Sequence, residues 1–197
     1  MGGVRLLDKL GIEPGVYHLN EGHSAFLITE RIVSLMKDAG IPFETAREVV
    51  KGSTVFTTHT PVPAGNEKFN KNLIENYFRN YIRDAGIEWD KFWDLGHVYA
   101  GDETEFDMTV YALKNSFKRN GVSRLHGQES RDMWKNIWQG FIVDEIPIDH
   151  ITNGVHTESW IAGEMKQLFE NSGARTWDFK PEDDVWDRIR DISAGKI

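Results

Sequence analysis

Three short polar segments contain the side chains best suited to chemistry in this sequence. Each follows a run of apolar or β-branched residues and is built from residue types that favour neither helix nor strand; the segments are residues 20–23, 58–61 and 152–157. Ligands of open α/β sheets bind beyond the carboxyl ends of the strands. We therefore expect the three segments to converge on one cleft. Taken singly they have simpler interpretations, because Asn20 suits a helix N-cap and Asn153 with Gly154 suits a turn.

Histidine is the side chain whose ordinary pKa lies nearest neutrality, so the seven histidines are the first candidates for acid–base or metal chemistry. The sequence contains no His-Glu-x-x-His or His-x-His pattern and no cysteine. A zinc site would need ligands from distant segments, and we predict no metal. The glycine patterns of a hydrolase nucleophile elbow, a dinucleotide site and a P-loop are also missing, which leaves those three classes without support.

Two further side chains are candidates for ligand contacts. The local charge balance turns basic between residues 114 and 135, and Arg124 lies there in a short strand-like run where it could serve an anion. Trp160 follows the polar segment 152–157 and could form the wall of a ligand pocket by stacking.

The elements that position these residues follow an alternation of short apolar runs and amphipathic stretches, which predicts an α/β fold. Strands are expected at residues 16–19 and 54–58. A helix is expected from Phe26 to a stop at Gly40. Further helices are predicted at residues 42–50, 73–85, 89–95, 106–119, 129–138, 161–170 and 181–192.

Composition excludes several classes of protein. The 197 residues carry a net charge of −8 and are 40% hydrophobic, enough for a sizeable core. No basic stripe would release counterions from nucleic acid, so nucleic acid is not an expected partner. No apolar run approaches the roughly 18 residues of a membrane span, and no secretory signal is visible. The lack of cysteine fits a reducing compartment, and we predict a cytoplasmic protein without membrane contact.

Four longer segments, in order and with matching spacing, carry a resemblance to a known family. They read YHLNEGHSAF at 17–26, VFTTHTPVPAG at 55–65, NGVSRLHG at 120–127 and HITNGVHT at 150–157. They resemble the α-glucan (glycogen, starch or maltodextrin) phosphorylases, and more closely the shorter bacterial and archaeal type. The resemblance runs from Gly2 to about the C-terminus.

The resemblance implies a glycosyltransferase with two Rossmann-like lobes, of the GT-B type. Such an enzyme moves a glucosyl unit between the end of an α-1,4-glucan or maltooligosaccharide and orthophosphate, giving glucose 1-phosphate with retained configuration. Its cofactor is pyridoxal phosphate, whose phosphate assists proton transfer.

The resemblance also implies roles for single residues. His59 corresponds to the histidine whose ring and backbone carbonyl lie against the transferred glucose, and Asn153 to the asparagine that hydrogen-bonds the hydroxyls of that sugar. Trp160 corresponds to a tryptophan beside the cofactor. With Arg124 as the anion contact, we expect His59 to be catalytic, Asn153, His59 and Arg124 to bind substrate, and Trp160 to bind cofactor.

The segment that follows the first strand lines the anomeric side of the pocket in the family. Asn20, Glu21 and His23 occupy it here, and longer family members have an aspartate in place of Glu21. We expect Glu21 and His23 to be catalytic and Asn20 to bind substrate.

Family enzymes are much longer than this chain, and nothing in it matches the glycine-rich motif of the Schiff-base lysine. The chain is therefore expected to be an internal fragment that is inactive alone and prone to self-association. Residues 1–150 would form the second half of the N-terminal lobe, and residues 151–197 the crossover toward the C-terminal lobe. Two alternatives remain open: a stand-alone carbohydrate-binding α/β module, and a transferase related to the glucan synthases.

Overall fold

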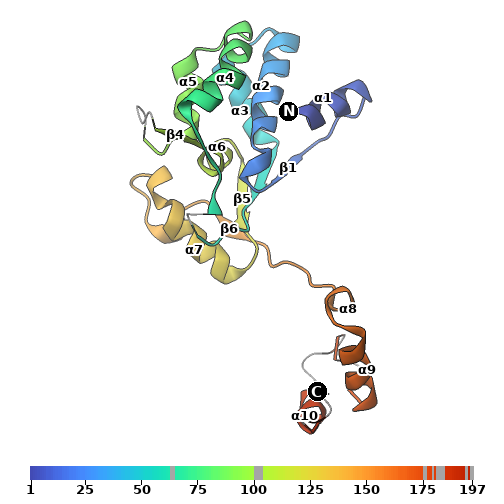
Figure 1. Ribbon diagram of the computed structural model, residues 1–197. Helices are drawn as coiled ribbons and strands as arrows, with labels where there is room; N and C mark the ends of the chain where they lie inside the picture. The colour runs from blue at the N-terminus through green and yellow to red at the C-terminus, as the bar shows by residue number, and fades with distance from the viewer. Residues whose placement is uncertain are drawn as a thin grey trace. The chain divides into compact units, whose positions relative to one another are not determined.

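The computed structural model describes residues 1–62, 65–99, 104–174, 177–178, 180, 185–193 and 195 (Figure 1). The chain divides into two compact units, Met1–Thr152 and Asn153–Ile197. The assignment of these units to one lobe and a crossover of a larger enzyme stays a prediction.

The first unit is built on a four-stranded sheet in the order β1-β2-β5-β6. The strands are β1 (Tyr17–Asn20), β2 (Thr54–Thr57), β5 (Lys118–Gly121) and β6 (Asp149–His150). All three pairings are parallel, which confirms the predicted α/β class. The register sets Asn20 beside Thr57, and Thr57 beside Asn120. A separate antiparallel ribbon pairs β3 (Lys68–Asn70) with β4 (Glu105–Asp107).

Helices connect the strands, and local signals explain several of their ends. The helices of this unit are α1 (Gly2–Lys9), α2 (Phe26–Ala39), α3 (Phe43–Gly52), α4 (Lys71–Asp84), α5 (Trp89–Trp93), α6 (Met108–Lys114) and α7 (Arg124–Trp134). Short 3₁₀ turns are η1 (Gly22–Ser24), η3 (Asp94–Gly96), η4 (Lys135–Ile137) and η5 (Val143–Glu145). The helix predicted from Phe26 ends where expected, because Gly40 takes the left-handed conformation at φ 65°. Asn70 caps α4 by accepting a hydrogen bond from the Leu73 N–H at 2.9 Å.

The core of the first unit lies between the sheet and the helices that follow β1 and β2. Leu19 and Phe56 project from neighbouring strands and are almost fully buried, as is Ile28 of α2. An aromatic cluster extends this core, with the rings of Phe92 and Phe106 stacked at a centroid distance of 5.4 Å. Each fully buried side chain of this size contributes about 1.5–3 kcal/mol, so the cluster holds α2 and α5 against β4 of the antiparallel ribbon.

The helix predicted at 106–119 is wrong. That stretch holds the end of β4, the helix α6 and the start of the central strand β5. Asp107 begins α6 by accepting hydrogen bonds from the Thr109 and Val110 N–H groups, so the chain before it is free to pair as a strand. β5 has a polar sequence, KRNG, that lacks strand propensity, and its position between β2 and β6 determines its conformation.

Two predictions near the polar segments are also corrected. Arg124 does not lie in a strand-like run, because it is the first residue of α7, which begins five residues before the helix predicted at 129–138. The Ser123 hydroxyl accepts from the His126 N–H at 3.1 Å and so caps this helix. Asn20 is no helix N-cap: it is the last residue of β1, and Ala25 precedes α2.

The second unit is helical. It contains α8 (Thr157–Trp160), α9 (Gly163–Asn171) and α10 (Val185–Arg190). Ala174 and Trp177 form its buried core, and the Trp177 ring packs edge-on against Phe169 at 5.3 Å. α9 and α10 match the helices predicted at 161–170 and 181–192, although residues 181–184 of the second prediction lie outside the described part of the chain.

Candidate functional site

The four segments that carry the family resemblance each contain the end of one strand of the parallel sheet, and they are numbered here in chain order. β1 ends at Asn20, β2 at Thr57, β5 at Gly121 and β6 at His150. Because the strands are parallel, their carboxyl ends lie at one edge of the sheet, and the segments that leave them start side by side (Figure 1).

Glu21 joins the first two segments. Its carboxylate oxygen Oε1 accepts a hydrogen bond from the His59 backbone N–H and another from the Thr60 hydroxyl at 3.1 Å. The Glu21 N–H donates to the Thr57 carbonyl at 2.9 Å, which continues the β1–β2 pairing by one residue. Segments 20–23 and 58–61 thus meet as predicted, with Glu21 as the link, while their convergence with segment 152–157 on one cleft stays a prediction.

The backbone of Glu21 is strained. It has φ 68° and ψ 166°, and no other non-glycine residue in the described part of the chain has a positive φ. This region is essentially restricted to glycine and costs about 1–3 kcal/mol for another residue. Two hydrogen bonds to the Glu21 side chain hold the residue in this strained conformation. They also fix the position of its carboxylate.

Gly22 places the first segment directly against α6. A Cβ atom added to Gly22 would lie 3.0 Å from the Thr109 hydroxyl and 3.2 Å from the Thr109 nitrogen. Only a residue without a side chain allows this approach. The turn η1 is therefore fixed from two sides, by Glu21 toward β2 and by Gly22 toward α6.

His126 joins the third segment to the second. The Val122 N–H donates to its Nδ1 at 3.1 Å, so in the neutral ring Nε2 carries the proton. Nε2 in turn donates to the Thr60 carbonyl at 3.3 Å. The side chain is buried, and it connects the start of α7 with the segment after β2.

A row of hydrogen bonds crosses three strands next to this edge. The Thr57 hydroxyl donates to Asn120 Oδ1 at 3.0 Å and accepts from His18 Nε2 at 2.7 Å. Asn120 Nδ2 donates to the Gly121 carbonyl at 3.1 Å. Sequence reasoning assigned no role to these residues or to His126, although all four of His18, Thr57, Asn120 and His126 lie in the segments that carried the family resemblance.

Two glycines bring the fourth segment against the third. A Cβ atom on Gly121 would lie 2.9 Å from the Gly127 nitrogen, and one on Gly127 would lie 3.0 Å from the His150 Cβ. The Ile151 N–H donates to the Gly121 carbonyl at 3.0 Å. The chain therefore leaves β6 with His150 packed on the start of α7 and Ile151 hydrogen-bonded to the end of β5.

The remaining predicted residues of the first unit lie at the same edge without described side-chain partners. Asn20 ends β1 and His23 lies in η1, and both are exposed. Arg124 begins α7 and is exposed. His59 is exposed as well, and its backbone N–H is held by Glu21.

A sequence model of the carbohydrate phosphorylase family matches residues 9–177. The chain belongs to this family. It is 43% identical to the maltodextrin phosphorylase of Thermococcus litoralis over 187 residues, which are 94% of this chain and 22% of that relative. It is 40% identical to the glycogen phosphorylase of Mycobacterium tuberculosis, with 100% of this chain and 24% of the relative covered. The glycogen phosphorylase of Aquifex aeolicus is 34% identical over 97% of this chain and 27% of its own length.

This phosphorylase chain therefore spans about a quarter of the length of its curated relatives. The matched region of the family runs through both units, so Asn153 and Trp160 lie inside it. Both residues belong to the second unit, where Asn153 is exposed and Trp160 is 83% exposed. Their roles toward sugar and cofactor stay predictions.

The pyridoxal phosphate contact predicted for this phosphorylase chain lies in its second unit. Trp160, the single predicted cofactor contact, presents a largely exposed indole on the four-residue helix α8. No cluster of three or more histidine, aspartate or glutamate side chains in the described ranges could hold a metal ion. None of the helices described is long and apolar enough to cross a membrane.

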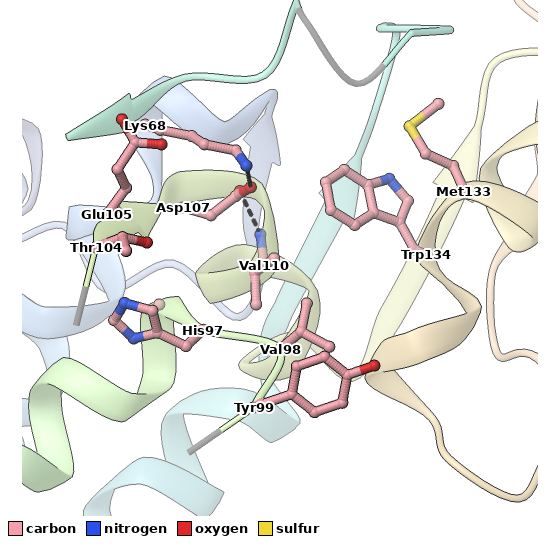
Figure 2. A pocket seen from close by; sticks show the side chains of 11 residues that line it. Lys68, His97, Val98, Tyr99, Thr104, Glu105, Asp107, Val110, Met133 and Trp134 are labelled. Atoms are coloured by element: carbon pink, nitrogen blue, oxygen red, sulfur yellow. Dashed lines mark hydrogen bonds and ion pairs between the residues drawn. The ribbon is translucent and has the colours of Figure 1, made fainter. Parts of the chain in front are cut away.

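The cavity shown in Figure 2 is separate from this edge. It has a volume of about 280 Å³ and lies between Met133 and Trp134 of α7 on one side and Lys68 and Asp107 of the antiparallel ribbon on the other. The ammonium of Lys68 lies 3.5 Å from the Asp107 carboxylate, which also caps α6. No residue predicted for the site lines the cavity, so the phosphorylase motifs do not point to it.

Proposed function

We propose that the protein containing this chain is an α-1,4-glucan phosphorylase, which transfers a glucosyl unit between a glucan end and orthophosphate to give glucose 1-phosphate. The observation that carries the proposal is the meeting of segments 20–23 and 58–61 at the carboxyl edge of the sheet, in a chain of the carbohydrate phosphorylase family. Relatives named maltodextrin phosphorylase and glycogen phosphorylase support the substrate class.

The wider architecture is part of the same proposal. The whole protein would be a two-lobed, cytoplasmic GT-B enzyme, with the first unit as the second half of the N-terminal lobe and the second unit as the crossover. It would use pyridoxal phosphate bound through a lysine outside these 197 residues. The chain alone would then be inactive. Exposed apolar side chains such as Leu6, Leu10 and Val16 favour its self-association.

His59 is proposed to contact the transferred glucose with its ring and backbone carbonyl. The contacts of Glu21 fix the backbone on one side of His59 and the Thr60 hydroxyl on the other. We assign Glu21 to positioning, because its Oε1 is already occupied by two protein donors. A rigid His59 matters because groups held in place before the reaction stabilise a developing charge without reorganising.

The other predicted residues supply the sugar and anion contacts of the proposal. Asn20 and His23 are exposed at the edge and would face the anomeric side of the glucose. The Asn153 amide can donate and accept at once, which suits a sugar hydroxyl. Arg124 would contact the phosphate as a charge partner. An oxocarbenium-like transition state gains from such oriented dipoles.

The test is phosphorolysis by the parent protein, with maltoheptaose and orthophosphate as substrates and glucose 1-phosphate as the measured product. Asn153→Ala should lower kcat/KM by about 1–3 kcal/mol of transition-state binding, the range for removing one partner of a buried polar contact. Asn72→Ala is the matched control, because Asn72 is exposed on α4 away from the sheet edge, and it should leave kcat/KM unchanged.

Two outcomes would decide for the alternatives. Glucan binding without release of glucose 1-phosphate would favour a carbohydrate-binding module. Glucan extension from a nucleotide sugar, with no reaction of orthophosphate, would favour a glucan synthase-like transferase. An Asn153→Ala variant with unchanged kcat/KM would remove Asn153 from the site.

A further inference from the structure

A second cavity lies at the opposite end of the sheet from the phosphorylase segments. It has a volume of about 330 Å³, at the lower end of the range for small-molecule sites, and it is lined by the first residues of β5 and β6 and by α7. Three cationic side chains line it: Lys118, Arg119 and Arg131. None of the residues predicted for the glucosyl site does so.

Arg119 is a buried cation, only 9% exposed. Its Nε–H donates to the Leu113 carbonyl at 2.6 Å, and its guanidinium carbon lies 5.3 Å from the centre of the Trp138 ring. Burial lowers the pKa of Arg119 to about 10. Within the described ranges, no carboxylate forms an ion pair with Arg119 that would raise this pKa again. A guanidinium has five N–H donors, so two contacts leave donors free for a ligand.

Arg131 reaches the same cavity from α7. One terminal nitrogen, Nη1, donates to the Ile148 carbonyl at 3.1 Å. Its Nε is buried and has no hydrogen-bond partner in the described structure. A buried donor without a partner costs about 1–3 kcal/mol, more when the group is charged, so a ligand that accepts this hydrogen bond would be favoured.

The remaining charges of the cavity lie at its solvent side. Lys118 is exposed, with its ammonium 5.4 Å from the centre of the Phe117 ring. Two carboxylates, Asp144 and Asp149, also line the cavity and are exposed, and Asp149 already accepts the His150 N–H at 2.7 Å. The charged groups that reach the interior of the cavity are thus the buried Arg119 and the half-buried Arg131, while both carboxylates are solvated.

We propose that this cavity binds a phosphate-sized oxyanion, held by the guanidinium groups of Arg119 and Arg131 with Lys118 at the rim. A buried and a half-buried guanidinium group, both with unused donors, match the tetrahedral oxygens of phosphate, because charge-assisted and bidentate hydrogen bonds are the strong ones. The ligand is either free orthophosphate or a phosphate monoester. The site is independent of the proposed glucosyl transfer, since it lies at the other end of the strands.

The test uses the 197-residue chain and isothermal titration with orthophosphate, at an ionic strength held constant with sodium chloride. Wild type should bind phosphate, and Arg131→Gln should weaken that binding by about tenfold or more. Arg83→Gln is the matched control: it removes an equal charge from the exposed face of α4, outside the cavity and outside the proposed glucosyl site, and should leave binding unchanged. A parallel titration with glycerol 3-phosphate distinguishes the sources, since tighter binding of the monoester would assign the site to organic phosphates.

A second measurement avoids variants that fail to fold. In the NMR spectrum of the wild-type chain, phosphate should shift the Nε–H signals of Arg119 and Arg131 and leave that of Arg83 in place. The proposal would be overturned by binding no tighter than that of chloride, by equal losses in Arg131→Gln and Arg83→Gln, or by unshifted Arg119 and Arg131 signals.

Discussion

At the scale of single residues, Glu21 shows how the fold fixes a carboxylate at the sheet edge. The carboxylate satisfies a backbone donor and a hydroxyl on the neighbouring segment, while its own backbone occupies a conformation that other residues avoid. The side-chain contacts stabilise the folded chain, whereas the strained backbone destabilises it. Substitutions at Glu21 can separate these two contributions to the free energy of unfolding.

Glu21→Ala should destabilise the chain by about 1–3 kcal/mol, because it removes both side-chain contacts and keeps the strained backbone. Glu21→Gly removes the same contacts and relieves the strain, so its loss should be smaller by about 1 kcal/mol or more. Urea unfolding of both variants measures the difference. Equal stability of the two variants would show that the backbone of Glu21 is not strained.

At the scale of elements, α1 is attached to the rest of the first unit by a charged network. The Arg5 guanidinium donates two hydrogen bonds of 2.8 Å to the Glu30 carboxylate of α2, and the Tyr81 hydroxyl of α4 donates a third at 3.0 Å. Burial favours the neutral acid, but the hydrogen bonds from Arg5 and Tyr81 hold the pKa of Glu30 below its ordinary value.

The network makes stability depend on pH in a defined direction. A carboxyl whose pKa is lower in the folded state contributes stability above its unfolded pKa, about 4.3 for glutamate, and loses that contribution as the pH falls through the folded pKa. Wild type should therefore lose stability more steeply than Glu30→Gln in acid, measured by urea unfolding from about pH 7 to pH 3. Parallel curves for the two proteins would contradict the lowered pKa of Glu30.

The packing of β5 on α7 depends on the missing side chain of Gly121. Gly121→Ala should destabilise the chain by about 1–3 kcal/mol, because its Cβ would lie 2.9 Å from the Gly127 nitrogen and from His126 Nδ1. Gly52→Ala is the control: no atom lies within 4 Å of its added Cβ, and alanine in helix α3 should be neutral or stabilise by up to about 1 kcal/mol. Thermal unfolding compares them, and equal shifts would argue against the close contact.

At the scale of the whole molecule, the two units differ in how much core they contain. The first buries a large set of side chains around the sheet, whereas the second buries Ala174 and Trp177 with Ile161 and Phe169 packed against them. Apolar burial is the main source of folding stability, so the second unit should open more readily.

Native-state hydrogen exchange tests this difference. Amides of α9 should exchange at least about tenfold faster than those of β2 and β5, after correction for intrinsic rates, because opening a small core exposes little apolar surface. The α4 amides serve as a control for helices, since Ile74, Phe78 and Ile82 anchor that helix in the first core and should slow its exchange. Equal protection of α9 and α4 would show that the second unit is as stable as the first.

The sequence by itself determined the α/β class, the stop of α2 at Gly40 and membership of the phosphorylase family. Each of these conclusions depends on a short-range pattern: the period of the hydrophobic residues, a glycine that ends a helix, and family motifs in matching order and spacing. It also placed Glu21 and His59 in segments that follow predicted strands. Because such segments meet at one edge of a parallel sheet, the two residues were expected to lie close together.

Only the tertiary structure decided which atoms meet. The Glu21 contact with His59 spans 38 residues of sequence and the His126 contact with Thr60 spans 66, so neither leaves a local signal. The same reason explains the error at 106–119: β5 is a strand because β2 and β6 supply its hydrogen-bond partners, whatever the propensity of its own residues. Long-range strand pairing and the close contacts of Gly22 and Gly121 form only when the sheet is assembled. Local sequence patterns therefore do not predict them.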